Sequence, residues 1–182
     1  MTLNQLFNEV YALGFDAADE LNESFIFSVN RALKMIFTEL TPSVRAKIFV
    51  DRDADKTIDL LKRIDNVMII TSAPLNSLGQ IIKGAYTDGY ILTLPEDFSG
   101  DVFIKYKPLP REFTLNDGES KIDVPPFASH LVPILTASFV FLDDDEEKAD
   151  YYMTMYRHEV LKINHQHAMS TDNTYTDVTG WA

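Results

Sequence analysis

The spacing of apolar residues changes twice along this chain, and this change limits the folds that the chain can adopt. From Thr2 to Leu40, apolar residues recur in steps of three and four, which is typical of helices with one buried face. From Ala46 to Pro125, they gather in short β-rich runs separated by polar turn residues. Helical spacing returns from Ala128 to Asn164. The sequence therefore predicts an α+β fold in the order helix, sheet, helix.

The helical segments are bounded by residues that end helices. Helices are expected over residues 2–13, 17–40, 128–142 and 146–164. Gly14 ends the first helix and Pro42 stops the second. The acidic link Asp143–Asp145 joins the last two helices, and acidic residues favour a helix N-terminus because they complement the helix dipole. Such a short link predicts an antiparallel helical hairpin.

The middle of the chain predicts an antiparallel sheet. Strands are expected over residues 47–50, 66–71, 79–86, 89–94, 101–107 and 122–124. Asp88 and Gly89 form a hairpin-turn signal. Pro125 and Pro126 close the β region, because proline donates no hydrogen bond to a sheet.

These segments predict a helical bundle, made by the N- and C-terminal helices, with an inserted antiparallel β lobe. The helical domain comprises residues 1–44 and 126–164, and the β-rich lobe comprises residues 45–125. Residues 165–182 are polar and show no sustained period, so an extended C-terminal arm is expected there.

Composition narrows the function classes. The formal net charge of −12 argues against binding the phosphates of nucleic acid, which requires Lys and Arg, and favours protein partners. The absence of cysteine excludes disulfides, thiolate metal sites and cysteine nucleophiles. No signal-peptide pattern opens the chain. The apolar run Leu131–Leu142 is too short to cross a bilayer, so no membrane insertion is expected.

Two groups of residues have partial features of metal sites. Asp51, Asp53 and Asp55 alternate as in a calcium loop, but Lys56 and Lys62 stand where glycine and a bidentate Glu are needed, so a solvated turn is favoured. A second group, His158, His165 and His167, has no characteristic ligand spacing. No metal ligand is predicted, and a metal-dependent enzyme using these His and Asp residues is a secondary alternative.

No arrangement of residues predicts catalysis. Ser129 and His130 are adjacent, but no Gly-x-Ser-x-Gly elbow surrounds them. The acidic run Asp143–Glu147 is favoured as a turn followed by a helix start. The glycines Gly79, Gly84 and Gly89 are not followed by a helix, as a phosphate-binding loop would be. The sequence predicts no catalytic residue, no cofactor and no enzyme activity.

An alternative function is a protein- or carbohydrate-binding module acting through the β lobe. Tyr86, Tyr90 and Tyr106 could line a sugar-binding face, although aromatic residues in strands more often form core or cross-strand pairs. This alternative predicts a monomer with a clustered aromatic face.

The order of features in residues 101–160 resembles that of head–tail adaptor, or connector, proteins of tailed bacteriophages. These features are Tyr106–Pro110, Ile122–Pro125, His130–Leu135 and the acidic corner within Phe141–Tyr152, followed by Tyr156. In such proteins a strand and a proline-marked turn lead to a helix, an acidic corner and a second helix. The helix within residues 16–40 gives weaker support.

The resemblance implies a non-enzymatic virion protein, assembled in the cytoplasm of the bacterial host. Proteins of that family form rings, commonly dodecameric, that bridge the portal protein and tail components, and DNA passes through the lumen. Their C-terminal arms often dock on a neighbouring subunit or on the portal. The corresponding partner-binding residues here are Tyr175, Val178 and Trp181. An exposed Trp in a polar segment is costly to leave in water and is well suited to anchor in a partner pocket.

Overall fold

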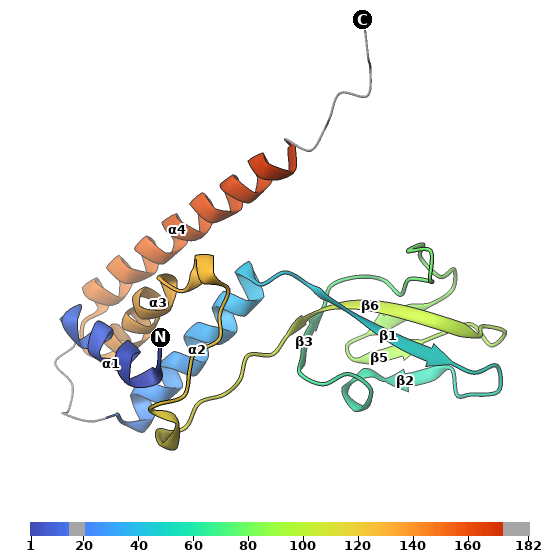
Figure 1. The fold of residues 1–182 in the computed structure, drawn as a ribbon, viewed down its shortest axis with the longest axis horizontal. Coiled ribbons are helices and arrows are strands. Elements are labelled where there is room, and N and C mark those ends of the chain that lie inside the picture. The colour runs from blue at the N-terminus through green and yellow to red at the C-terminus, as the bar shows by residue number, and fades with distance from the viewer. Residues whose placement is uncertain (15–20, 173–182) are drawn as a thin grey trace, which may run out of the picture. The chain divides into compact units, whose positions relative to one another are not determined.

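The chain folds into two compact units. The computed structural model describes residues 1–14 and 21–172, with side chains described up to residue 165. One unit combines Met1–Leu40 with the chain from Glu112 onward, and the other is Thr41–Arg111. We call them the helical unit and the β unit (Figure 1). The α+β fold class, with helices at both ends of the chain and antiparallel sheets between them, is confirmed.

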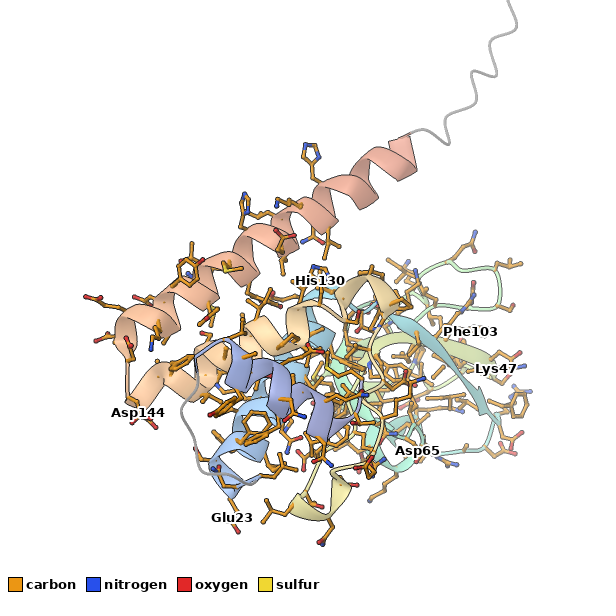
Figure 2. All side chains as sticks on the ribbon, turned by 60° about the vertical axis from the view of Figure 1, so that its left-hand side comes forward. Glu23, Lys47, Asp65, Phe103, His130 and Asp144 are labelled. Atoms are coloured by element: carbon orange, nitrogen blue, oxygen red, sulfur yellow. The ribbon has the colours of Figure 1, made fainter. Side chains whose placement is uncertain are left out.

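The β unit contains two three-stranded antiparallel sheets. The first has the order β1 (Val44–Val50), β6 (Gly100–Pro108), β3 (Val67–Ile70), and the second has the order β2 (Thr57–Asp59), β5 (Ile91–Thr93), β4 (Tyr86–Asp88). Alternate residues of the first sheet point inward, so that the side chains of Ile48, Val102 and Ile104 join one buried cluster with Leu92 of the second sheet. Lys47 and Phe103, labelled in Figure 2, lie opposite each other on β1 and β6.

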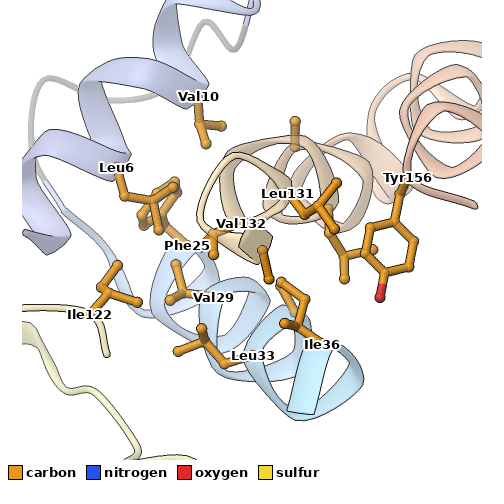
Figure 3. Close-up of a cluster of buried hydrophobic side chains, with 14 of the residues drawn as sticks. Leu6, Val10, Phe25, Val29, Leu33, Ile36, Ile122, Leu131, Val132 and Tyr156 are labelled. Carbon is orange, nitrogen blue, oxygen red and sulfur yellow. The ribbon is translucent and has the colours of Figure 1, made fainter. Parts of the chain in front are cut away.

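The helices of the helical unit enclose a single hydrophobic core. They are α1 (Leu3–Ala12), α2 (Glu23–Leu40), α3 (Leu131–Val140) and α4 (Glu146–Asp172). Figure 3 shows side chains from all of them converging, among them Val10, Val29, Leu131 and Tyr156. Thr2 and Gln5 form a capping box at the start of α1. The Tyr152 hydroxyl of α4 donates a hydrogen bond of 2.7 Å to the carbonyl of Leu13.

The chain returns to the helical unit earlier than the sequence predicts. Residues from Glu112 belong to the helical unit, whereas the predicted return is at Pro126. Asn30 of α2 fixes this returning segment, because its side-chain amide donates to the Phe113 carbonyl at 2.9 Å and accepts from the Phe113 N–H at 2.8 Å. Phe113 and Ile122 then bury their side chains in the helical core.

Three predicted local structures are wrong. The strand over residues 122–124 is replaced by a single bridge between Thr2 and Lys121. The expected strand over residues 79–86 is irregular except for an isolated bridge at Ile81 and the strand residue Tyr86, and both Gly79 and Gly84 have positive φ. The extended arm does not begin at His165, because α4 continues to Asp172. Residues 165–172 contain no glycine or proline, so nothing in them stops a helix that is already formed.

Candidate interaction surfaces

The residues considered for metal binding do not assemble a metal site. The Lys56 ammonium donates to the backbone carbonyls of Asp51 and Arg52, at 2.7 and 2.8 Å, so this loop is organised around a lysine. His158 and His165 are exposed, and the side chain of His167 lies outside the described residues. Within residues 1–14 and 21–165, no group of three or more His, Asp or Glu side chains is placed to hold a metal ion.

Ser129 and His130 have separate partners. The Ser129 hydroxyl donates to the carbonyl of Pro126 at 2.9 Å, and the His130 ring lies 4.0 Å from the Glu159 carboxylate. A hydrogen bond from Lys162 is the main cause of the lowered pKa of Glu159. Each of these polar groups is therefore engaged in local structure, and the serine and histidine do not form a nucleophile–base pair.

The acidic run between α3 and α4 begins the last helix, as the sequence predicts. The Asp145 carboxylate accepts a hydrogen bond of 3.1 Å from the backbone N–H of Lys148 and lies 3.3 Å from the Lys148 ammonium. The backbone hydrogen bond is the main cause of the lowered pKa of Asp145. Asp145 thus caps α4, while Asp144 and Glu147 remain exposed.

The three tyrosines considered for sugar binding do not share one exposed face. Tyr90 and Tyr106 pack against the core of the β unit, and the Tyr90 hydroxyl donates to the Met68 carbonyl at 2.6 Å. Tyr86 is 57% exposed, whereas Tyr90 and Tyr106 are half-buried. This arrangement matches the core role of aromatic residues rather than a ligand-stacking surface.

Tyr156 is the most perturbed titratable group among the described residues. Its side chain is fully buried, and its hydroxyl donates a 2.8 Å hydrogen bond to the exposed Glu39 carboxylate of α2. Burial first, and then the Glu39 carboxylate, raise the pKa of Tyr156 well above its ordinary value of 10.0. This pair joins α2 to α4, so we assign it a structural role.

The raised pKa of Tyr156 predicts a loss of stability at alkaline pH. Because the folded state holds this proton more tightly than the unfolded state, the contribution is complete below the unfolded pKa of 10.0 and falls above it. Wild type should therefore be more stable than Tyr156→Phe near neutrality, and this advantage should shrink above about pH 10, by at most about 1.4 kcal/mol per pH unit. Denaturant unfolding of both proteins between about pH 8 and about pH 11 measures the difference, and a constant difference would contradict the assignment.

A shallow apolar groove lies in the helical unit between α2 and the returning segment. It encloses about 460 Å³ and is lined by Phe27, which is 68% exposed, and by Leu115, which is 45% exposed. Sequence reasoning missed this groove, because Phe27 lies outside the buried stripe of α2 and the position of Leu115 depends on tertiary contacts. Phe27 is the only signal that the sequence offers, as a large apolar residue on the polar side of the helix.

Charge is divided unequally between the two units. The β unit contains 10 of the 16 Lys and Arg residues and 9 of the 28 Asp and Glu residues, which gives it a net charge of +1. The other 6 basic and 19 acidic residues give the helical unit a net charge of −13. The overall charge of −12 thus conceals an almost neutral unit joined to a strongly acidic one.

The predicted arm residues Tyr175, Val178 and Trp181 lie outside the described residues. Among the helices that are described, none is both long and apolar enough to span a membrane. Comparison with models of known protein families and with curated proteins found no match.

Proposed function

We propose that this chain is a structural virion protein, a head–tail adaptor that forms an oligomeric ring between the portal and the tail of a tailed bacteriophage. The proposal rests on the resemblance of residues 101–160 and on the form of the helical unit. Its site would be a set of protein–protein contacts, with the function lying in assembly rather than turnover.

The end of α4 is the structural observation that supports this proposal most. Ile163 is the last side chain of α4 described as buried, yet the helix continues to Asp172, which adds about 13 Å at 1.5 Å per residue. Figure 1 shows this end of α4 extending past the other helices of its unit. Residues 164–172 are mostly polar in sequence, and a polar helix end gains little stability from its own chain, so a neighbouring subunit would supply stabilising contacts.

The charge of the helical unit suits the same role. The helical unit has a net charge of −13 and repels phosphates, so a ring lined by this unit would let DNA pass without binding it. The C-terminal arm, with Tyr175, Val178 and Trp181, would supply the anchors that hold a neighbour or the portal.

Deletion of residues 173–182 tests the arm. We expect the full chain to form a ring, alone or on purified portal protein, and the deleted chain to bind at least about tenfold more weakly, because the apolar anchors are lost. Light scattering gives the mass of each mixture, and Trp181→Ala isolates the contribution of the indole. Thr179→Ala, which changes a polar residue of the same segment, is the matched control.

Equal binding by the full and deleted chains would show that the arm is not the anchor. A strict monomer that ignores the portal would favour the alternative of a binding module acting through the β lobe. Circular dichroism of each variant checks that the helical unit remains folded, because α4 itself is retained up to Asp172.

A further inference from the structure

Most of the charged residues on the outer face of the β1–β6 ribbon are cationic. Directly opposite residues of an antiparallel pair point to the same side, so three cross-strand pairs make up this face. The pairs are Arg45 with Lys105, Lys47 with Phe103, and Phe49 with Asp101. We call these six residues the basic face. The alternate residues Ile48, Val50, Val102 and Ile104 are buried in the core of the β unit, which fixes the basic face outward.

The basic face combines cations with exposed apolar surface. Arg45, Lys47 and Lys105 are exposed, and Phe49 is 67% exposed. The Arg45 guanidinium lies over the Phe103 ring, 3.7 Å from its centre, and the Lys47 ammonium lies 2.9 Å from the Asp101 carboxylate.

Two features of this face favour an acidic partner. Arg45 lies directly opposite Lys105, and like charges in that position destabilise a strand pair. A carboxylate from a partner would relieve this repulsion. The neighbouring exposed Phe49 offers an apolar centre with charges around it, which is the usual organisation of a protein interface.

The helical unit carries a surface of the complementary kind. At the junction of α3 and α4, the carboxylates of Asp143, Asp144, Glu146, Glu147 and Asp150 are exposed. Leu142, 48% exposed, and Tyr151, 61% exposed, lie among them. We call this set of residues the acidic corner. Asp144, at this corner, is labelled in Figure 2, as are Lys47 and Phe103 of the basic face.

We propose that the basic face of one copy of this chain binds the acidic corner of a second copy. Each surface has apolar side chains set among charges, and the charges of the two surfaces have opposite sign. A contact between two different surfaces leaves one of each free on the pair, so further copies add head to tail, and a ring forms when the rotation between neighbours closes. The inference rests on the proposed function and names the contact that would join neighbouring subunits of the ring.

A protein partner fits the basic face better than nucleic acid does. The face has three cations and contains Asp101, and the chain as a whole has a charge of −12. Tight binding to a phosphate backbone requires more cations and a net positive surface. Phe49 and Phe103 would add apolar contact with Leu142 and Tyr151 of a protein partner.

Two complementary charge-reversed variants of the full chain test the contact. The first variant, Lys47→Glu with Lys105→Glu, reverses the charge of two residues of the basic face and leaves the acidic corner unchanged. The second variant, Asp144→Lys with Glu147→Lys, reverses the charge of two residues of the acidic corner. It leaves the basic face and the Asp145 cap unchanged. Lys62→Glu with Arg63→Glu is the matched control, because both residues are exposed in the same unit and lie outside β1 and β6.

We expect each variant alone to self-associate roughly 30-fold or more weakly than wild type, because like charges then face each other. A one-to-one mixture should regain assembly, with masses above twice the chain mass of 20.7 kDa, because the two variants can alternate through the native contact and the charge-reversed contact. Combining all four reversals in one chain should restore self-association. Sedimentation velocity at low salt measures all of these masses.

Monomers in the mixture, or variants that associate as wild type does, would overturn the contact. So would a variant of the basic face whose mass is unchanged but which loses binding to a short DNA duplex. These results would leave the adaptor function standing, because portal binding is measured separately. If the mixed assemblies form but do not bind the portal, the adaptor function is overturned and the contact is not.

Discussion

Leu131→Ala is expected to lower the free energy of unfolding of the helical unit by about 2–5 kcal/mol. Leu131 has no exposed side-chain area and lies at the start of α3, among residues of the other helices of the unit. Removing three of its carbons leaves a cavity that rigid helices fill only in part. Denaturant unfolding followed by helical circular dichroism measures the loss.

Leu142→Ala is the control for this experiment. Leu142 lies just after α3 and is 48% exposed, so its truncation should change the free energy of unfolding by less than about 1 kcal/mol. Equal losses for Leu131→Ala and Leu142→Ala would contradict the described core. The comparison removes the same atoms from the same residue type and changes only the burial.

Ile104→Ala is expected to destabilise the β unit by a similar amount, about 2–5 kcal/mol, with little effect on the helical unit. Ile104 of β6 is fully buried in the second hydrophobic cluster, whose members all come from residues 46–106. Because each unit has its own core, the cavity should weaken only the unit in which it lies.

Hydrogen exchange measured by mass spectrometry separates the two responses. Amide exchange in β1, β3 and β6 should accelerate in Ile104→Ala, while exchange in α2 and α3 stays at the wild-type rate. Ile81→Ala, at a residue that is 67% exposed, should leave both units unchanged. Acceleration throughout the chain would show that the units unfold as one body.

Local patterns predicted the elements whose burial is periodic. The stripe from Phe25 to Leu40 marks α2, and alternation around Ile48 marks β1. The end of the β region could not be predicted in this way. Phe113 and Ile122 look like residues of a sheet in sequence, and only tertiary contacts with α1 and α2, such as the Asn30 pair, assign them to the helical core.

The C-terminal end of α4 could not be predicted from apolar spacing for a different reason. Residues 165–172 lack an apolar period, and a period reports burial rather than helicity. Propensity alone, together with the absence of glycine and proline, continues α4 to Asp172. The arm residues Tyr175, Val178 and Trp181 are known only from the sequence, and their role as anchors stays a prediction.

Only one of the two surfaces of the proposed contact can be recognised from the sequence. The acidic corner is visible as a run of carboxylates, and a count of charge by segment indicates the division between the units. The basic face requires the strand register, because Arg45 and Lys105 are 60 positions apart and meet only through the β1–β6 pairing. Register depends on tertiary packing, and a shift of one residue would turn these cations inward.

The proposed ring between portal and tail can be seen directly. The experiment is negative-stain electron microscopy of the purified full chain mixed with portal rings at low salt. We expect closed rings of the chain seated on one end of the portal. Portal rings without added density, together with a chain that remains at its monomer mass of 20.7 kDa, would contradict it.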